Sequence, residues 1–404
     1  MAQEAPDFLG RDGQLDGEAA AWLRLLTTPG VGRVTARRLL ARAGSAQGIW
    51  ELPHGAWREC ATEAQANALA ALPERWEQQL EATAHWLARP APGLAHALVP
   101  LGHARYPDSL LQTQDPPLLL YVQGPAELLA SARPWFPYPR ALAVVGSRSP
   151  SAQGLLNARQ MSQALAGRGL CIVSGLAQGI DAAAHEGALK AAATASAPVT
   201  IAVVGTGLDQ VYPRRHAGLA REVALHGLVV SEYPLGSGPL AANFPQRNRI
   251  ISGLGQGTLV VEAALQSGSL ITARLASEQG REVFAIPGSI HALQSKGCHA
   301  LLRQGAKLVE CVDDILEELQ GIESLANPLP NAPETRAKTT LEPDASTPEH
   351  PLLAAMGHDP LPLDELVART GWSAAQLQAR LMELELDGRV ARLPGGAYQR
   401  LVRG

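Results

Sequence analysis

Residues 144–154, VVGSRSPSAQG, join a short apolar run to a glycine turn and then to the expected start of a helix. A strand that enters a helix through a glycine turn is how nucleotide-binding folds begin. The same alternation repeats after residue 141, with candidate strands at residues 141–145, 170–173, 200–204, 228–230, 258–261 and 282–286. The pattern predicts an α/β fold with a doubly wound parallel sheet that is covered on both faces.

The first loop lacks the residues that a nucleotide cofactor requires. A dinucleotide fingerprint has three close glycines and an acidic residue at the end of the next strand. Only Gly146 and Gly154 are present, and the next strand ends without an acid at Val173-Ser174-Gly175. No P-loop motif occurs in the chain. The turn Gly146-Ser147-Arg148 offers backbone N–H groups and one guanidinium, which suits a single phosphate, and we expect no cofactor.

Three later loops also favour anions. Residues 244–257, FPQRNRIISGLGQG, place Phe244 before Arg247, Asn248 and Arg249 with no acid in the stretch. An aromatic ring beside arginines is the pairing that single-stranded nucleic acid uses, although Phe244 could instead pack beneath its helix. Two further loops follow strands and carry Gly268 with Ser269, and Arg214 with Arg215. Strand ends of a parallel sheet meet at one edge, so these loops are expected to track successive phosphates.

One pair of residues is compatible with an enzyme. Asp181 and His185 stand four residues apart, would share a helix face, and follow Ser174. No third ligand or partner is placed beside them, and an Asp at a helix start is commonly a cap. We therefore expect a structural role for the pair, with no catalytic residue and no metal site.

Composition limits the remaining classes. The 404-residue chain is long enough for several domains, and its net charge of −4 gives no general attraction to nucleic acid. Four widely spaced cysteines without a CxxC pair indicate reduced thiols. The first residues are polar and acidic, and no apolar stretch approaches the ~20 residues that span a bilayer. These features predict a soluble, cytoplasmic protein with no membrane contact.

Residues 15–90 are expected to form a separate α-helical unit. Within it, TTPGVGRVTARRLLARAG (residues 27–44) has the pattern of a helix-hairpin-helix, or SAM-like, motif. The arginines at positions 33, 37, 38 and 42 would lie on one side of its second helix. Two interpretations remain open, namely DNA contact through this side and a solvated basic face.

The end of the chain predicts a linker and a second small unit. Residues 325–350 are rich in Pro, Thr, Ala and charge and are expected to be extended or disordered. Residues 351–404 have the pattern of a winged helix, with Ser373 as a helix cap, a buried stripe of Leu377, Leu381 and Leu384, and a turn at Pro394-Gly395-Gly396.

Several motifs together resemble the DprA/Smf family. They are VVGSRSPSAQG, SGLAQGIDAAAH, GTGLDQVYPRRH, SEYP, NFPQRNRIISGL, VVEAALQSGSLITARLASEQGREVFAIPG and GCHALLRQGAKLV, in this order, within residues 99–320. The resemblance implies an extended Rossmann-like core and a protein of natural transformation. Such a protein binds and protects incoming single-stranded DNA and loads the RecA recombinase. It is typically a homodimer, without established catalysis or cofactor.

The resemblance also assigns roles to particular positions. The DNA-facing positions it implies are Gly146, Ser147, Arg148, Phe244, Arg247, Asn248, Gly268 and Ser269, with Arg214 and Arg215 where members often carry a basic residue. Some members place a basic residue just before the aromatic, and Leu240-Ala241-Ala242-Asn243 supplies none here. Dimerisation is expected through residues 297–312, where an apolar edge segment could pair across a two-fold axis.

Two alternatives belong to other classes. Phosphoribohydrolases of similar fold use a PGGxGTxxE loop with a catalytic Glu, whereas the corresponding stretch here, SGSLITA, has no carboxylate. A winged-helix transcription regulator is the other. Its recognition helix would carry Arg380 together with Glu383, Glu385 and Asp387, and these acids would oppose docking on phosphates. The winged helix is therefore predicted to contact protein or to regulate.

Overall fold

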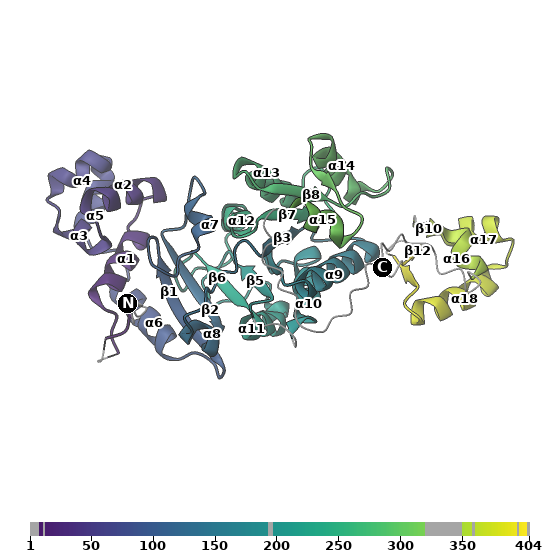
Figure 1. Ribbon diagram of the computed structural model, residues 1–404, viewed down its shortest axis with the longest axis horizontal. Coiled ribbons are helices and arrows are strands. Elements are labelled where there is room, and N and C mark those ends of the chain that lie inside the picture. The colour runs from purple at the N-terminus through teal and green to yellow at the C-terminus, as the bar shows by residue number, and fades with distance from the viewer. Residues whose placement is uncertain are drawn as a thin grey trace.

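The computed structural model describes residues 8–10, 13–192, 197–319, 350–357, 360–393 and 396–401. Within these ranges a nine-stranded sheet forms the centre of the protein, with helices on both of its faces (Figure 1). The strand order is β1-β2-β6-β5-β4-β3-β7-β8-β9. The predicted α/β class with a doubly wound, mostly parallel sheet is confirmed.

The six predicted strands are present and pair in parallel. They are β3 (Ala141–Val145), β4 (Cys171–Ser174), β5 (Thr200–Val203), β6 (Leu228–Ser231), β7 (Gly257–Val260) and β8 (Glu282–Ala285). The helices that connect them are α9 (Ala152–Gly167), α10 (Ile180–Leu189), α11 (Ala217–His226), α12 (Asn243–Leu254) and α13 (Ser269–Glu278). The first five of these strands are buried along their whole length, which explains their continuous apolar sequences.

The direction of winding reverses beside β3. The chain passes from β3 through β4 and β5 to β6 on one side, and α12 then carries it back to β7 on the other side of β3. The carboxyl ends of β3 and β7 therefore border the crevice at which open parallel sheets bind ligands. Beyond β8, the chain forms η3 (Leu293–Ser295), α14 (Lys296–Arg303), the edge strand β9 (Lys307–Leu308) and α15 (Val312–Glu318).

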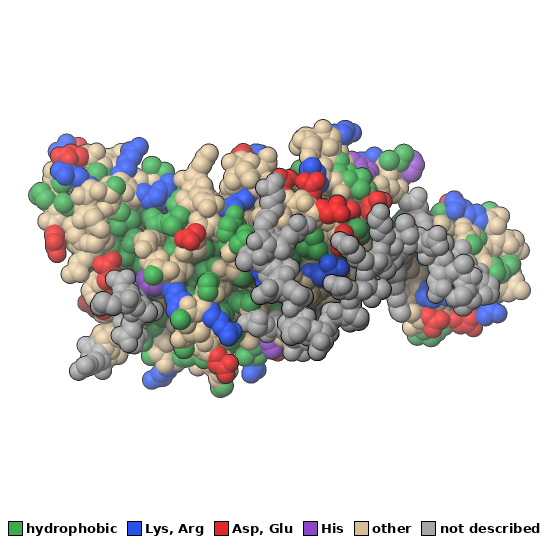
Figure 2. Space-filling view, viewed as in Figure 1, with side chains coloured by type: hydrophobic (Ala, Val, Ile, Leu, Met, Phe, Trp, Pro, Cys, Tyr) green, Lys and Arg blue, Asp and Glu red, His purple; other side chains and the backbone are tan. Residues whose placement is uncertain are grey.

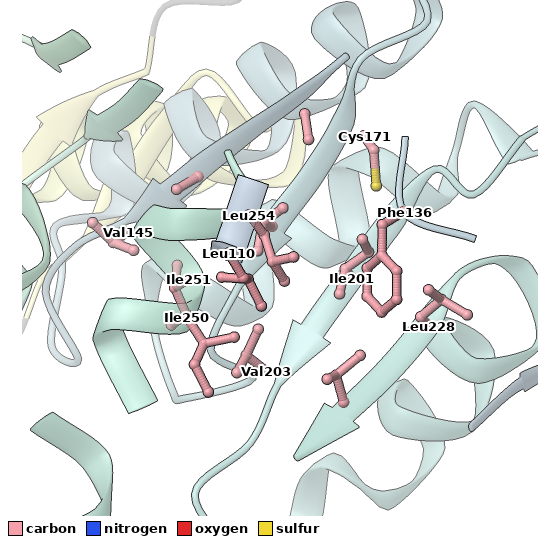
Figure 3. Packing of buried hydrophobic residues seen from close by; sticks show 14 of the residues in the cluster. Leu110, Phe136, Val145, Cys171, Ile201, Val203, Leu228, Ile250, Ile251 and Leu254 are labelled. Atoms are coloured by element: carbon pink, nitrogen blue, oxygen red, sulfur yellow. The ribbon is translucent and has the colours of Figure 1, made fainter. Parts of the chain in front are cut away.

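Helix α12 is held firmly on the sheet. Ile250, Ile251 and Leu254 pack in the main hydrophobic cluster with Leu110 and Val203 (Figure 3). These apolar residues recur at three- and four-residue spacing and so face the sheet together. The amino-terminal end of α12, which carries the predicted binding residues, is fixed in place by this packing.

Two antiparallel strands were not predicted. Strands β1 (Leu94–Pro100) and β2 (Leu119–Pro125) pair with each other, and β2 continues the sheet antiparallel to β6. Their pairing joins residues across the loop that contains α7 (Asp108–Leu111), so local sequence gave little signal for it. A short helix, α8 (Ala126–Ala130), follows β2.

The amino-terminal helices share a core with these two strands. They are α1 (Gly17–Thr27), α2 (Arg33–Ala43), α3 (Ala46–Glu51), α4 (His54–Cys60), α5 (Glu63–Ala70) and α6 (Trp76–Ala88). One buried cluster contains residues of α1, α2 and α3 together with Leu98, Leu119 and Tyr121 of the sheet. The Trp86 ring of α6 also stacks on His96 of β1, with ring centroids 4.0 Å apart. The helices expected over residues 15–90 are therefore packed against the sheet.

An ion network connects α2 to α12. Asp115 accepts hydrogen bonds from Arg33 Nε and Arg37 Nη1, each at 2.7 Å, and lies 3.2 Å from Arg249 Nε. The two carboxylate oxygens of Glu232 accept from the guanidinium of Arg249 at 2.6 and 2.7 Å. Arg33 and Arg37 thus serve the attachment of α2 to the core, so neither open interpretation of a four-arginine face, DNA contact or solvation, describes them.

The carboxyl-terminal unit is a winged helix, as predicted. Its elements are α16 (Pro351–Met356), α17 (Leu363–Thr370), α18 (Ala374–Leu386), β10 (Leu361–Pro362), β11 (Val390–Arg392) and β12 (Ala397–Arg400). Ser373 caps α18 in a capping box with Gln376, and Leu377, Leu381 and Leu384 are buried. The predicted linker at residues 325–350, apart from residue 350, and the turn residues Pro394 and Gly395 lie outside the described residues. No described helix combines the length and apolar character needed to cross a bilayer.

Replacing Asp115 by Asn should loosen the attachment of α2 and lower the free energy of unfolding by about 1–2 kcal/mol, since three guanidinium groups lose their shared charge. Burial opposes ionisation of Asp115, but Arg37, Arg249 and Arg33 outweigh it and hold its pKa below the ordinary value. A carboxyl group with a lowered pKa stabilises the fold above its unfolded pKa of about 3.9, and loses that effect as the pH falls through the folded value.

Thermal unfolding of the unaltered protein and of Asp115→Asn between pH 3 and pH 8 measures this difference in stability. We expect the gap between the midpoints to be constant above about pH 6 and to close at the acidic end. Glu63→Gln, which removes one exposed partner of Arg58, is the matched control and should change little. A gap that grew as the pH fell would contradict the role given to Asp115.

Candidate nucleic-acid interface

A hollow of about 690 Å³ opens at the carboxyl ends of β3 and β7. Its walls come from the loop after β3, the start of α12, the loop between β7 and α13, and Tyr212. Eight of the predicted site residues line it: Gly146, Ser147, Arg148, Phe244, Arg247, Asn248, Gly268 and Ser269. The structure therefore brings together residues that lie more than 100 positions apart in the sequence.

The loop after β3 is held from two sides. Ser147 N–H donates to the backbone oxygen of Glu262 at 2.7 Å, and the carbonyl of Ser147 accepts from Ile180 N–H at 3.1 Å. A Cβ atom on Gly146 would lie 2.7 Å from Ile180, so only glycine allows this close packing. Arg148 extends from the fixed loop, is exposed, and forms no ion pair within the described residues. Its charge is thus available to an anion in the hollow.

Two aromatic rings stand at the same opening. The Phe244 ring lies 5.5 Å from the Tyr212 ring, centroid to centroid, and the Arg148 guanidinium lies 5.6 Å from the Phe244 centroid. Phe244 is half-buried above Gly205, while Tyr212 is 47% exposed. Tyr212 was not predicted, although an aromatic two residues before Arg214 in a strand-end loop was a usable signal. Rings beside a guanidinium provide a surface on which bases stack.

Arg247 lies on the floor of the hollow and is only 3% exposed. Its Nη1 donates to the carbonyl of Val203 at 2.6 Å, and Gly175 packs directly against the guanidinium. Burial lowers the pKa of Arg247 to about 10, against the opposing charge of Asp181. Arg247 therefore supplies a buried positive charge beneath the hollow, and the direct phosphate contact expected of it has no support in this geometry.

Arg249 does not line the hollow. It points to the network with Asp115 and Glu232, two acids that lie outside the stretch at residues 244–257. Burial opposes the charge on Arg249, but Glu232 and Asp115 raise its pKa above the ordinary value. Arg214 and Arg215 lie on the exposed turn η2 (Arg214–His216), close in sequence to Tyr212 but outside the lining of the hollow.

The opposite wall is the start of α13. A Cβ atom on Gly268 would meet no atom within 4 Å, so the backbone there faces open space. Ser267 Oγ and Ser269 Oγ lie 2.6 Å apart, and the Asn248 amide is within 3.4 Å of the Gly268 carbonyl. Hydroxyl and backbone N–H groups at the start of a helix are suited to an anion.

Asp181 and His185 are both buried, but only Asp181 lines the hollow. His185 Nδ1 bonds to Thr200 Oγ1 at 2.7 Å, and burial lowers the pKa of His185 to about 3. Burial also raises the pKa of Asp181, against the charge of Arg247, and its carboxylate accepts from Ala177 N–H at 3.4 Å. His185 is thus a neutral core residue. Among the described residues no group of three His, Cys, Asp or Glu side chains could hold a metal ion.

Sequence reasoning missed Glu262, which lies two residues after the buried end of β7. Its carboxylate accepts hydrogen bonds from Ser151 N–H at 2.9 Å and Ser151 Oγ at 2.5 Å. Ser151 is the N-cap of α9, so this carboxylate occupies the start of the first helix of the core.

On the face shown in Figure 2, Lys and Arg side chains are scattered among Asp and Glu and form no continuous stripe over the described residues. In α18, Arg380 pairs with Glu383 at 2.7 Å, and Met382 and Leu386 are 64% and 81% exposed. This apolar and acidic surface is unsuited to phosphates, as expected from the sequence.

Comparison with known proteins agrees with this architecture. The family described as DNA recombination-mediator protein A matches residues 97–320, which is more than half of the chain. The family described as DprA-like N-terminal HHH domain matches residues 16–66, and the DprA winged helix domain matches residues 336–396.

Individual relatives give the same result. Protein Smf of Escherichia coli is 45% identical over 341 residues, which cover 84% of each chain. The DNA processing protein DprA of Streptococcus pneumoniae is 47% identical over 215 residues, covering 53% of this chain and 71% of the relative. The crystal structure of that streptococcal protein superposes with a TM-score of 0.61 at 37% identity, over 74% of this chain and 97% of the other. The chain therefore belongs to the DprA/Smf family of DNA recombination mediators.

Proposed function

We propose that the hollow at the ends of β3 and β7 binds single-stranded DNA without strong sequence preference. The observation that carries this proposal is the placement of the exposed Arg148 guanidinium beside the rings of Phe244 and Tyr212. The guanidinium suits a backbone phosphate, and the rings suit base faces, which are open to stacking only in a single strand. Aromatic rings stack on any base, so the proposed site binds a single strand regardless of its base sequence.

The proposed path uses two walls of the hollow. One phosphate would lie at Arg148, and another at the open start of α13 beside Gly268 and Ser269. Arg214 and Arg215 are exposed near Tyr212 and would meet the strand as it leaves the hollow. Arg247 would act from below through its charge, and Arg249 would act only by holding α12 in place.

Replacing Arg148 by Ala should weaken binding of an oligo-dT strand roughly tenfold, because one charge-assisted contact is lost. The slope of log affinity against log salt should fall in magnitude by about 0.7, the share of one phosphate in a single strand. Gel shifts or fluorescence anisotropy at several salt concentrations measure both quantities. Arg89→Ala, at the exposed end of α6, is the control. An Arg148→Ala protein with unchanged affinity and slope would remove Arg148 from the site.

We further propose that the chain protects incoming DNA and loads the RecA recombinase during natural transformation, in the cytoplasm. Membership in a family of recombination mediators supports this proposal. RecA assembly on single-stranded DNA, followed by ATP turnover, should start sooner when the protein is added. The Arg148→Ala variant should accelerate it less. Assembly that proceeds at the same rate with and without the protein would contradict the loading role.

We also propose a homodimer built through residues 297–312. The strand β9 has a free edge in the sheet, and Leu308 is 50% exposed on it. A second hollow lined by Leu270, Leu301 and Ala306 lies beside this edge. Light scattering at micromolar concentration should report twice the mass of one chain. Leu308→Glu should lower the measured mass toward that of a single chain. Single-chain mass for the unaltered protein would refute this interface.

A phosphoribohydrolase is the enzyme alternative, and the arrangement of carboxylates speaks against it. Asp181 lines the hollow, but it is 7% exposed and lies beside the positive charge of Arg247, and both oxygens of Glu262 are bonded to Ser151. The loop at Ser267 to Thr272 provides no carboxylate in their place. We expect purified protein to release no free base from AMP, and measurable release of adenine would restore the enzyme interpretation.

A further inference from the structure

The carboxylate of Glu262 sits where nucleotide-binding folds usually place a phosphate. In these folds the N–H groups at the start of the first helix of the core hold the anion. Here Glu262 Oε2 accepts from Ser151 N–H at 2.9 Å, and Oε1 accepts from Ser151 Oγ at 2.5 Å. Ser151 Oγ in turn accepts from Gly154 N–H at 2.9 Å. Two N–H groups at the start of α9, those of Ser151 and Gly154, are thus bonded from within the chain.

Both glycines of the opening stretch pack against Glu262, and Gly146 also packs against Ile180. A Cβ atom on Gly154 would lie 2.4 Å from the carboxyl carbon of Glu262, and one on Gly146 would lie 2.9 Å from its backbone oxygen. A phosphate-binding loop needs glycines so that a ligand can approach its backbone. In this protein Glu262, rather than a ligand, approaches the backbone at these glycines.

Glu262 also holds the segment that carries Arg148. Its backbone oxygen accepts from Ser147 N–H at 2.7 Å, directly before Arg148, and its carboxylate holds Ser151, three residues after it. A carboxylate at a helix start is stabilised by the helix dipole and repels a second anion at the same point. A strand phosphate is therefore directed outward, to the guanidinium.

We propose that Glu262 is a specificity-determining and positioning residue. Its carboxylate occupies the position at the start of α9 where a phosphate would bind, and so excludes free phosphate and mononucleotides from it. Glu262 also holds Arg148 where its guanidinium can contact a single strand of DNA. The exclusion stands on the geometry alone. The positioning of Arg148 rests on the proposed binding of single-stranded DNA.

The exclusion is tested with inorganic phosphate as the probe. Glu262→Ala leaves the start of α9 open to an anion. This variant should bind phosphate with millimolar affinity in a calorimetric or ³¹P NMR titration, whereas the unaltered protein should not. Glu278→Ala, which removes an exposed acid from α13, is the matched control. A folded Glu262→Ala protein that binds no phosphate would overturn the exclusion, as would equal binding by the unaltered protein. This titration remains decisive if the unaltered protein fails to bind oligo-dT, in which case the proposed function fails separately.

The positioning is tested without removing the carboxylate. In Gly154→Ala the new methyl group must displace the flexible end of Glu262, while the helix itself gains a better helix former. We expect oligo-dT binding to weaken about tenfold. Gly167→Ala, at the other end of α9 where a Cβ atom meets nothing within 4 Å, should bind normally.

A double-mutant cycle completes the test. If Gly154→Ala and Glu262→Ala act through the same contact, the double variant should bind oligo-dT no more weakly than either single variant. Glu262→Gln keeps an acceptor for Ser151 N–H and should retain affinity within about twofold. Additive losses, or normal binding by Gly154→Ala, would show that Glu262 does not position Arg148. Because Gly154→Ala retains every charge, it gives this answer even if Glu262→Ala does not fold.

Discussion

The contact between Asp115 and three arginines governs the geometry of the hollow at the ends of β3 and β7. Arg33 and Arg37 come from α2, and Arg249 comes from α12, which also carries Phe244 and Asn248. Glu232 completes the network with two short bonds to Arg249, and both partners are almost fully buried. A buried pair is costly to break because the remaining charge loses its partner. The helix that shapes the hollow is therefore held by electrostatics on one side and by apolar packing on the other (Figure 3).

The sequence predicted the strands and the convergence of the loops, because both depend on local pattern. Buried parallel strands must be continuously apolar, and their carboxyl ends must meet at one edge. The partners of charged side chains depend instead on contacts far apart in the chain. Arg249 meets Asp115, 134 residues away, and Arg247 is covered by the loop at Gly175. Both arginines sit in a basic stretch for which the sequence predicted phosphate contacts; Arg249 is paired with acids, and Arg247 is almost fully buried at the floor of the hollow.

The unpredicted elements have the same origin. Strands β1 and β2 depend on pairing with each other, and β2 also pairs with β6. The role of Glu262 depends on its hydrogen bonds to Ser151, which lies 111 residues away in the sequence. Nothing in the local sequence indicated that Glu262 would pack against Gly146 and Gly154. The sequence predicted no cofactor at the opening loop because the required residues are missing, and the structure adds that an internal carboxylate is bonded to the N-cap residue of the helix that follows this loop.

The shared core between the amino-terminal helices and the sheet has a practical consequence for dissecting the protein. Residues 97–320 are the part that matches the recombination-mediator family, yet a chain cut to this range would lose the cover over Leu98, Leu119 and Tyr121. It would also remove both Trp86 and His96, whose rings stack on each other, together with the first residues of β1. Newly exposed apolar sheet is prone to aggregate. Loss of activity in such a fragment would then report on solubility, and point substitutions on the intact chain separate the roles of the parts more cleanly.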